Sequence, residues 1–230
     1  MATTFWVGEL HDPSGEDGSQ VCSTYDARWA QHWSGVAHGA VPGDAAGCPG
    51  SPTGGCDGVL AQGRCVTERR DAANDFFPRS VTARENPFYV DLPYDDVNDR
   101  TGFARRCAVV PWADDPGYGG RCGDRSFSYL KNRWVAIVGP NRRTCFGQVE
   151  DAGPARYDDA AYVFGAGETR PASGEYNNAG IEVSPALNGC LGFAELDGES
   201  DRVDWRFVDE PDVPAGPWRR VVTRSPVDNG

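Results

Sequence analysis

Long apolar runs, histidine and lysine are what this 230-residue chain has least of. No stretch approaches the roughly 18 apolar residues that a membrane-spanning helix requires, so we expect a soluble protein that does not enter a membrane. The few histidines, His11, His32 and His38, all lie early in the chain. Lysine occurs once, at Lys131, and we infer no function from its scarcity.

Basic residues are also outnumbered by acidic ones. The formal net charge is -12 and the sequence pI is about 4.6. Proteins that bind nucleic acid or anionic membranes need a basic face for the phosphate groups, so the sequence argues against both partners. A neutral polymer is a better match for this charge.

The eight cysteines form an even set without any Cys-x-x-Cys spacing. They are Cys22, Cys48, Cys56, Cys65, Cys107, Cys122, Cys145 and Cys190. Cysteine and histidine ligands of a metal usually lie a few residues apart in the sequence. We therefore predict disulfides and neither a metal site nor a cofactor. Their pairing stays open. Disulfides at this density indicate an oxidising compartment, so we expect a secreted, extracellular monomer whose leader has been removed before Met1.

The secondary structure is predicted to be mainly β. The 29 glycines and 17 prolines interrupt the sequence too often for long helices, and the apolar runs are short and alternating or β-branched. Strands are predicted at residues 131–138, 145–150, 180–183, 203–208 and 218–222. Helices are predicted at residues 23–33, 68–77 and 184–191, the last with Ser184 as N-cap and Pro185 at its first position.

No linker or internal repeat divides the chain, so we expect a single domain over residues 1–230. Its core is expected over about residues 85–222, with an N-terminal strand at residues 3–9. Residues 36–66 are rich in glycine, proline and cysteine and predict a loop region held by disulfides.

Two carboxylates follow apolar strands in the second half of the chain. The strand that starts at Cys145 ends in Asp151 just before Gly153-Pro154, and the next short strand carries Glu182 before Ser184-Pro185. This pattern resembles the double-psi β-barrel of the rare lipoprotein A family, in which a strand ends in Asn-Asp-Arg-Gly-Pro and continues to Ile-Asp-Leu-Ser. The resemblance places Asp151 on the family's catalytic aspartate and Glu182 on its second acid. Tyr89 stands where that family has the histidine associated with lytic transglycosylase activity.

A second resemblance is to family 45 glycoside hydrolases and expansins, which share this barrel. The former begin with Thr-Arg-Tyr-Trp-Asp, whose aspartate is the catalytic base. Here the chain reads Thr3-Thr4-Phe5-Trp6-Val7-Gly8-Glu9, with the aromatic pair but no acid directly after it. The resemblances together imply a six-stranded double-psi β-barrel with long disulfide-stapled loops and a few short helices.

Cleavage of a glycosidic bond requires a protonated carboxyl group for the leaving oxygen and a second carboxylate to attack or to activate water. Asp151 is the candidate acid. Its partner could be Asp91, Glu182, Glu9 or Asp95, whereas Glu150 should point to the other side of its strand. Structural explanations compete with each assignment: Asp151 as a turn cap, Glu182 as a helix cap, and Asp91, Asp95 and Asp96 as a solvated acidic loop or a calcium site.

Aromatic side chains are the second functional signal, because flat rings stack on the apolar faces of sugars. The candidates are Trp6, Trp33, Tyr89, Tyr94, Trp112, Tyr162 and Tyr176. Burial in the core is the alternative explanation for any of them.

The sequence therefore predicts a secreted polysaccharide-active protein. An endo-acting glycoside hydrolase on a β-glucan such as cellulose is the first hypothesis, with Asp151 as proton donor. A lytic transglycosylase acting on peptidoglycan is the enzymatic alternative, and a non-catalytic, expansin-like carbohydrate-binding or inhibitor protein is the other. Fold resemblance alone does not choose among them.

Overall fold

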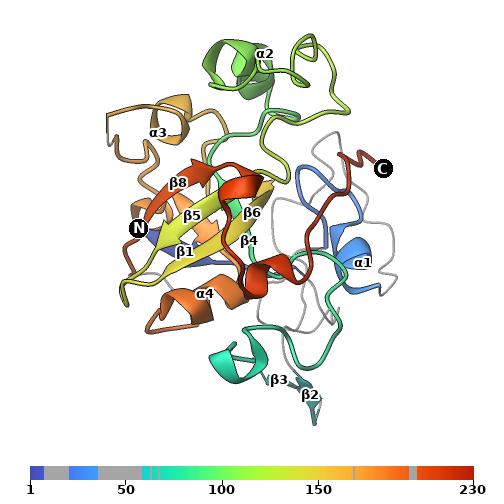
Figure 1. Cartoon of the computed structure of the whole chain (residues 1–230), viewed down its shortest axis with the longest axis vertical. Coiled ribbons are helices and arrows are strands. Elements are labelled where there is room, and N and C mark those ends of the chain that lie inside the picture. The colour runs from blue at the N-terminus through green and yellow to red at the C-terminus, as the bar shows by residue number, and fades with distance from the viewer. Residues whose placement is uncertain (8–20, 36–58, 63, 67, 168, 197–200) are drawn as a thin grey trace.

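A computed structural model describes residues 1–7, 21–35, 59–62, 64–66, 68–167, 169–196 and 201–230 (Figure 1). Its centre is a six-stranded sheet in the order β1-β7-β4-β6-β5-β8. The strands are β1 (Ala2–Thr4), β4 (Tyr89–Leu92), β5 (Trp134–Val138), β6 (Thr144–Ala152), β7 (Ile181–Val183) and β8 (Asp204–Val208). A separate hairpin consists of β2 (Val59–Ala61) and β3 (Arg64–Val66).

Short helices surround this sheet. They are α1 (Trp29–Ser34), α2 (Arg100–Val109), α3 (Ala160–Val163) and α4 (Pro185–Leu191), with four single 3₁₀ turns, η1 (Ala72–Asn74), η2 (Tyr176–Asn178), η3 (Glu210–Asp212) and η4 (Pro217–Arg219). In the part of the chain that the structure describes, no helix has both the length and the apolar character needed to cross a bilayer.

The sheet is mixed and curled into a half-barrel. β1 runs parallel to β7, and β4 runs parallel to β6, while the other neighbouring pairs are antiparallel. A backbone hydrogen bond of 2.9 Å from the Ala2 N–H to the Asp201 carbonyl joins β1 to the segment that precedes β8. The mainly β prediction is confirmed, and the strand pairings describe a curled sheet without showing a closed double-psi barrel.

Strand β5 shows why the middle of the sheet forms. Its sequence Trp-Val-Ala-Ile-Val is β-branched and apolar on both faces. Val135 and Ile137 enter the main core, while Trp134 and Ala136 pack with Phe146 in a second apolar cluster on the opposite face. Both faces of this strand are therefore buried up to Ile137, which is typical of a short continuous apolar run.

Helix α4 follows its sequence signals closely. The Ser184 side chain accepts a hydrogen bond of 3.2 Å from the Leu187 N–H, and Pro185 occupies the first helical position. The helix ends at Gly192, whose φ of 72° favours glycine. The prediction of a helix over residues 184–191 is confirmed.

Other sequence predictions were wrong or incomplete. Residues 68–77 form only the turn η1, and residues 218–222 contain no strand, because Trp218 lies in η4 and packs edge-on against Phe88. Helix α2 was not predicted. The Asp99 side chain caps this helix by accepting a hydrogen bond from the Gly102 N–H. Only Gly102 and Arg106 are buried along the helix, so the sequence has no apolar stripe that would indicate it.

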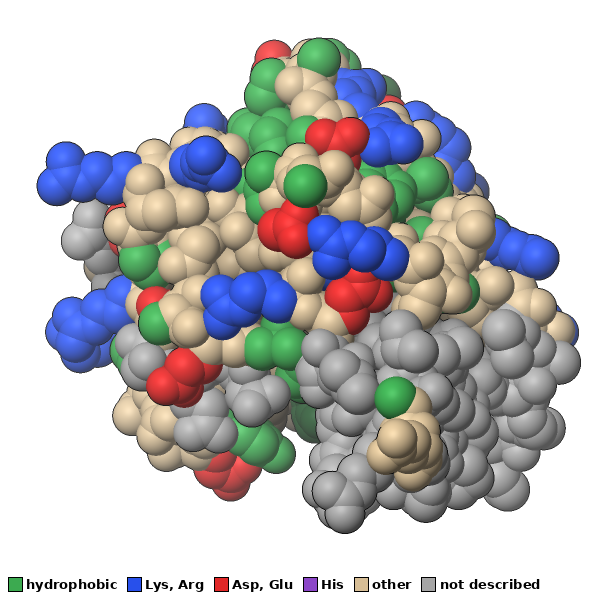
Figure 2. All heavy atoms as spheres, turned by 90° about the horizontal axis from the view of Figure 1, so that it is seen from below, with side chains coloured by type: hydrophobic (Ala, Val, Ile, Leu, Met, Phe, Trp, Pro, Cys, Tyr) green, Lys and Arg blue, Asp and Glu red, His purple; other side chains and the backbone are tan. Residues whose placement is uncertain are grey.

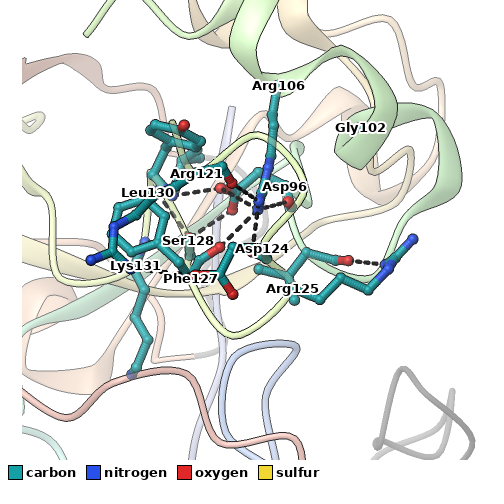
Figure 3. Close-up of polar contacts among 12 residues, drawn as sticks. Asp96, Gly102, Arg106, Arg121, Asp124, Arg125, Phe127, Ser128, Leu130 and Lys131 are labelled. Atoms are coloured by element: carbon teal, nitrogen blue, oxygen red, sulfur yellow. Dashed lines mark hydrogen bonds and ion pairs between the residues drawn. The ribbon is translucent and has the colours of Figure 1, made fainter. Parts of the chain in front are cut away.

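The segment after α2 is organised by a buried arginine (Figure 3). The Arg106 guanidinium donates hydrogen bonds to the carbonyls of Asp96, Arg121, Cys122, Asp124 and Phe127. Asp96 in turn accepts from the Ser128 hydroxyl and the Tyr129 N–H. One planar donor thereby fixes a loop that has little regular secondary structure of its own.

Disulfides reinforce the loop around Arg106 and the contact between β6 and α4. Cys107 bonds to Cys122 across the arginine-centred loop, and Cys145 of β6 bonds to Cys190 of α4. Cys22 is also disulfide-bonded. Cys48 and Cys56 lie outside the described residues, and no free cysteine occurs among the described ones.

Thiol titration of the unfolded, unreduced protein is expected to detect no reactive thiol. We expect this because the cysteine count is even and because Cys22, Cys107, Cys122, Cys145 and Cys190 are disulfide-bonded in the structure. Titration after reduction supplies the full thiol count as the control. Two or more reactive thiols before reduction would contradict complete pairing.

Candidate active site

Three neighbouring strands each contribute one carboxylate to a shared site. Asp91 of β4 lies opposite Asp151 of the parallel strand β6 and opposite Glu182 of the antiparallel strand β7. Since β4 is the middle strand, its acid has one acidic neighbour on each side. The pairing register, which the sequence does not state, is what brings the three acids together.

Asp91 and Glu182 form the closer pair. The Asp91 Oδ1 atom accepts a hydrogen bond of 2.9 Å from the Glu182 N–H. A Cβ placed on Gly153 would lie 2.5 Å from Asp91 Oδ2 and 3.3 Å from Glu182 Oε2, so both carboxyl groups press against the same glycine. Any larger residue at position 153 would collide with the Asp91 carboxyl group.

This crowding opposes ionisation of the pair. Burial and the nearby charges of Glu182 and Asp151 raise the pKa of Asp91 well above its usual range. Burial also raises the pKa of Glu182, although its hydrogen bonds to Asp91 and to the Thr3 hydroxyl (2.7 Å) oppose the shift. Two carboxyl groups packed against the same glycine oppose each other's ionisation, so the pair takes up its first proton at higher pH than an isolated carboxylate would.

Asp151 is buried beside that pair, with 6% of its surface exposed. Burial raises its pKa to about 7, even though two backbone N–H groups stabilise the charged form. Those N–H groups belong to Thr24 (2.7 Å) and Ala152 (2.8 Å), and both donate to Oδ1. A carboxyl group poised at this pKa can donate a proton near neutral pH.

A turn on the other side of the site holds Thr24 against Asp151. The Thr24 hydroxyl donates to Asp95 Oδ2 (2.5 Å), and the Asn98 side chain donates to the Thr24 carbonyl (2.6 Å). Asp95 Oδ1 also accepts the N–H groups of Val97 and Asn98. Asp95 therefore positions the segment that donates to Asp151, and its carboxylate is fully engaged in doing so.

An exposed tyrosine, Tyr157, lies near the acids, and a second exposed tyrosine, Tyr176, lies near Tyr157. Tyr157 and Tyr176 are 47% and 60% exposed, and with Val138 they are the exposed large hydrophobic residues of the described chain. The pKa of Tyr157 is raised to about 12 by burial of part of its ring and then by Asp151, Asp91, Tyr176 and Glu182. Its backbone carbonyl accepts from the Asp95 N–H, which fixes it beside the site.

The other predicted aromatic residues lie elsewhere. Trp6, Trp33, Tyr89, Tyr94 and Trp112 are buried, and Tyr162 is half-buried, with its hydroxyl accepting from the Trp205 indole. Tyr89 for example packs among Phe5, Trp29 and Trp33. A ring without an exposed face cannot stack on a sugar, so the prediction is corrected for the five buried residues.

The structure places some of the remaining candidate acids differently from the prediction. Asp95 and Asp96 are buried and hydrogen-bonded, so the solvated acidic loop was wrong for them. Glu150 does point away from Asp151, toward Lys131. Glu9 lies outside the described residues. Tyr157 was missed, because it follows the Gly-Pro turn in a polar segment without a strand or helix signal.

Comparisons with known proteins add no assignment to this site. No family model, curated protein or solved structure matches the chain. Function therefore has to be inferred from the site itself.

Proposed function

We propose that this protein is a secreted, endo-acting glycoside hydrolase that cleaves a β-glucan, with Asp151 as the proton donor. The observation that carries the proposal is the group of three neighbouring carboxyl groups, of which Asp91 and Asp151 are buried and Glu182 is partly buried. The pKa of Asp151 is raised to about 7, and the pKa values of Asp91 and Glu182 are raised as well. Glycosidic cleavage needs one protonated acid and one ionised carboxylate that flank the scissile bond.

The roles follow from the environments. Protonated Asp151 would donate to the leaving oxygen, while the ionised member of the Asp91 and Glu182 pair would activate water or attack the sugar. Because the two carboxyl groups are coupled, protonation of one of them would favour the charged form of the other. Tyr157 and Tyr176 would stack on sugar rings on either side of the scissile bond.

The half-barrel also supports a finer architectural proposal. If β1 and β8 complete their contact beyond the hydrogen bond between Ala2 and Asp201, the sheet closes into a double-psi barrel with the acids at one rim. The disulfides support secretion, since such bonds persist in oxidising compartments. Among the described residues on the face shown in Figure 2, arginine and acidic side chains are interspersed. The net charge of -12 favours an uncharged polymer over a polyanion as substrate.

Two other functions remain candidates. A lytic transglycosylase needs only one acid, because a substrate hydroxyl replaces water, and Asp151 alone would suffice. A non-catalytic, expansin-like binder has no use for a second carboxyl group, which the Asp91 and Glu182 pair supplies. The pair therefore favours hydrolysis.

A substrate panel separates these functions. The purified protein is incubated with β-glucans, other plant and fungal polysaccharides and peptidoglycan, and products are read by mass spectrometry. Hydrolysis of a β-glucan supports the proposal. An anhydro product from peptidoglycan indicates the transglycosylase, and binding without any product indicates the binder.

Replacing either exposed tyrosine is expected to weaken polymer binding. Loss of one aromatic stacking contact costs about 0.5 to 1.5 kcal/mol, so Tyr157→Ala and Tyr176→Ala should each lower affinity by roughly twofold to tenfold. Affinity electrophoresis in gels containing the polymer measures this. Tyr162→Phe, which removes a hydroxyl from a half-buried ring, is the control and should bind as the wild type does. Unchanged affinity in both alanine variants would remove the tyrosines from the site.

A further inference from the structure

A second cluster of polar side chains lies where the C-terminal segment meets the segment before α1. Asp26, His32 and Asp228 each offer a ligand atom, and these atoms all lie within 4.8 Å of one another. The His32 Nδ1 atom is 2.7 Å from Asp26 Oδ2. Asp26 is buried, while the His32 and Asp228 side chains are 33% and 24% exposed, so an ion could enter from solvent.

The remaining atoms of these carboxylates are already oriented by hydrogen bonds. Asp26 Oδ1 accepts from the Arg28 N–H at 2.8 Å, and Asp228 Oδ1 accepts from the Gly230 N–H at 3.0 Å. Asp228 Oδ2 accepts from Arg28 Nε (3.0 Å) and Nη2 (2.6 Å). Carboxylates that ligate metals are usually held in this way by outer hydrogen bonds.

A buried acid with an unpartnered oxygen interacts with this cluster. Glu85 is buried, and its Oε2 atom has no hydrogen-bond partner, while Oε1 accepts from the Ser225 hydroxyl. Glu85 interacts electrostatically with both Asp26 and His32, and Glu150 interacts with Glu85 and Asp26. Arg28 pairs with Asp228 and Lys131 pairs with Glu150, whereas Glu85 has no ion-pair partner among the described residues. A divalent cation would balance this charge.

We propose that Asp26, His32 and Asp228 form a binding site for a divalent transition-metal cation of the Zn²⁺ class. One imidazole nitrogen with two carboxylates suits such ions better than calcium, which takes oxygen ligands only. The Arg28 side chain is 56% exposed and can move into water when the ion takes its place on Asp228. The ion would fasten the C-terminal segment to the loop that carries Thr24. This site is independent of the proposed glycosidase function.

No motif in the sequence indicates this site. Asp26 and His32 lie 6 residues apart, and Asp228 lies 200 residues after Arg28. The expectation of no metal rested on the lack of short ligand spacings, which a site assembled from distant segments does not need.

Metal titration of the full, oxidised protein tests the site. After dialysis against a chelator, Zn²⁺ is added in a calorimeter, and Co²⁺ is added while visible absorption is recorded. Wild type is expected to bind a single Zn²⁺, and its Co²⁺ form is expected to show an absorption spectrum that indicates a nitrogen ligand. His32→Ala and Asp228→Asn should each weaken binding by about tenfold or more, because even outer-shell changes cost that much.

Arg28→Ala makes the test sharper, because it removes the competing cation and should tighten metal binding. Asp124→Asn, which alters another aspartate paired with an arginine, should bind as the wild type does. If wild type fails to bind Zn²⁺, or if His32→Ala and Asp228→Asn bind it unchanged while remaining folded by circular dichroism, the cluster is an ordinary ion-pair network and the proposal is overturned.

Discussion

Asp151→Asn is expected to lower turnover on the susceptible β-glucan by about 10² to 10⁴, the usual contribution of general acid–base catalysis. Asparagine has the same shape but no transferable proton. Both hydrogen bonds to the Asp151 side chain, from Thr24 and Ala152, end on one oxygen, so the amide oxygen can accept both of them. The substitution should therefore leave the site's structure and its affinity for the polymer intact.

The same variant should be more stable than wild type at neutral and higher pH. Burial raises the pKa of Asp151 to about 7 in the folded state, so the folded protein binds a proton that the unfolded chain has already lost. The stabilisation of the folded state by this bound proton is fully present below the pKa of Asp151 in the unfolded chain, and it is lost as pH rises through about 7. Thermal unfolding at several pH values should show a gap between variant and wild type that widens up to about pH 7.

Asp204→Asn, at an exposed position of β8, is the matched control for both measurements. It should leave turnover and the pH dependence of stability unchanged. Full activity of Asp151→Asn would assign the proton transfer to another acid. Unfolding of Asp151→Asn would show that the residue serves the turn before Gly153 instead of catalysis.

Lys131→Met is expected to destabilise the protein by about 3 to 5 kcal/mol at pH 8, the usual cost of removing one partner from a buried ion pair. Lys131 Nζ lies 2.7 Å from Glu150 Oε2, and both side chains are almost fully buried. Without the lysine, Glu150 must either stay charged without a partner or take up a proton, and both cost free energy at pH 8. Urea unfolding of the disulfide-bonded protein measures the loss.

The loss should depend on pH in a defined direction. Burial already raises the pKa of Glu150 to about 7 in spite of Lys131. In the variant that pKa rises further, so Glu150 is neutral at low pH and the destabilisation should shrink as pH falls. The double variant Lys131→Met, Glu150→Leu should recover most of the stability. A loss of less than about 1 kcal/mol at pH 8 in the single variant would show that the pair is exposed to water in solution.

The sequence predicted those parts of the fold whose signals are local. The β-branched run of β5 and the Ser184-Pro185 start of α4 are examples, because a pleated apolar strand and a capped helix need few distant contacts. Helix α2 was missed because its one buried long side chain, Arg106, serves backbone carbonyls from a distant loop. Trp218 alternates as in a strand but packs as part of a 3₁₀ turn.

The candidate site was only partly predictable for the same reason. Asp151 and Glu182 carry local signals, since each lies in or at the end of a short apolar strand. Their meeting with Asp91 depends on strand register, and the burial of Tyr89 depends on Trp29 and Trp33 packing over it. Whether an aromatic side chain faces a sugar or the core is decided by such distant neighbours, which composition does not reveal.

The pH dependence of β-glucan cleavage by wild-type protein tests the central claim most directly. With Asp151 as general acid, activity should be high below neutral pH and fall with an apparent pKa of about 7, because the proton donor is then lost. The residual activity of Asp151→Asn should lack this fall. Activity that stays constant through pH 7, or the absence of any cleavage at the pH where Asp151 is protonated, would contradict the account.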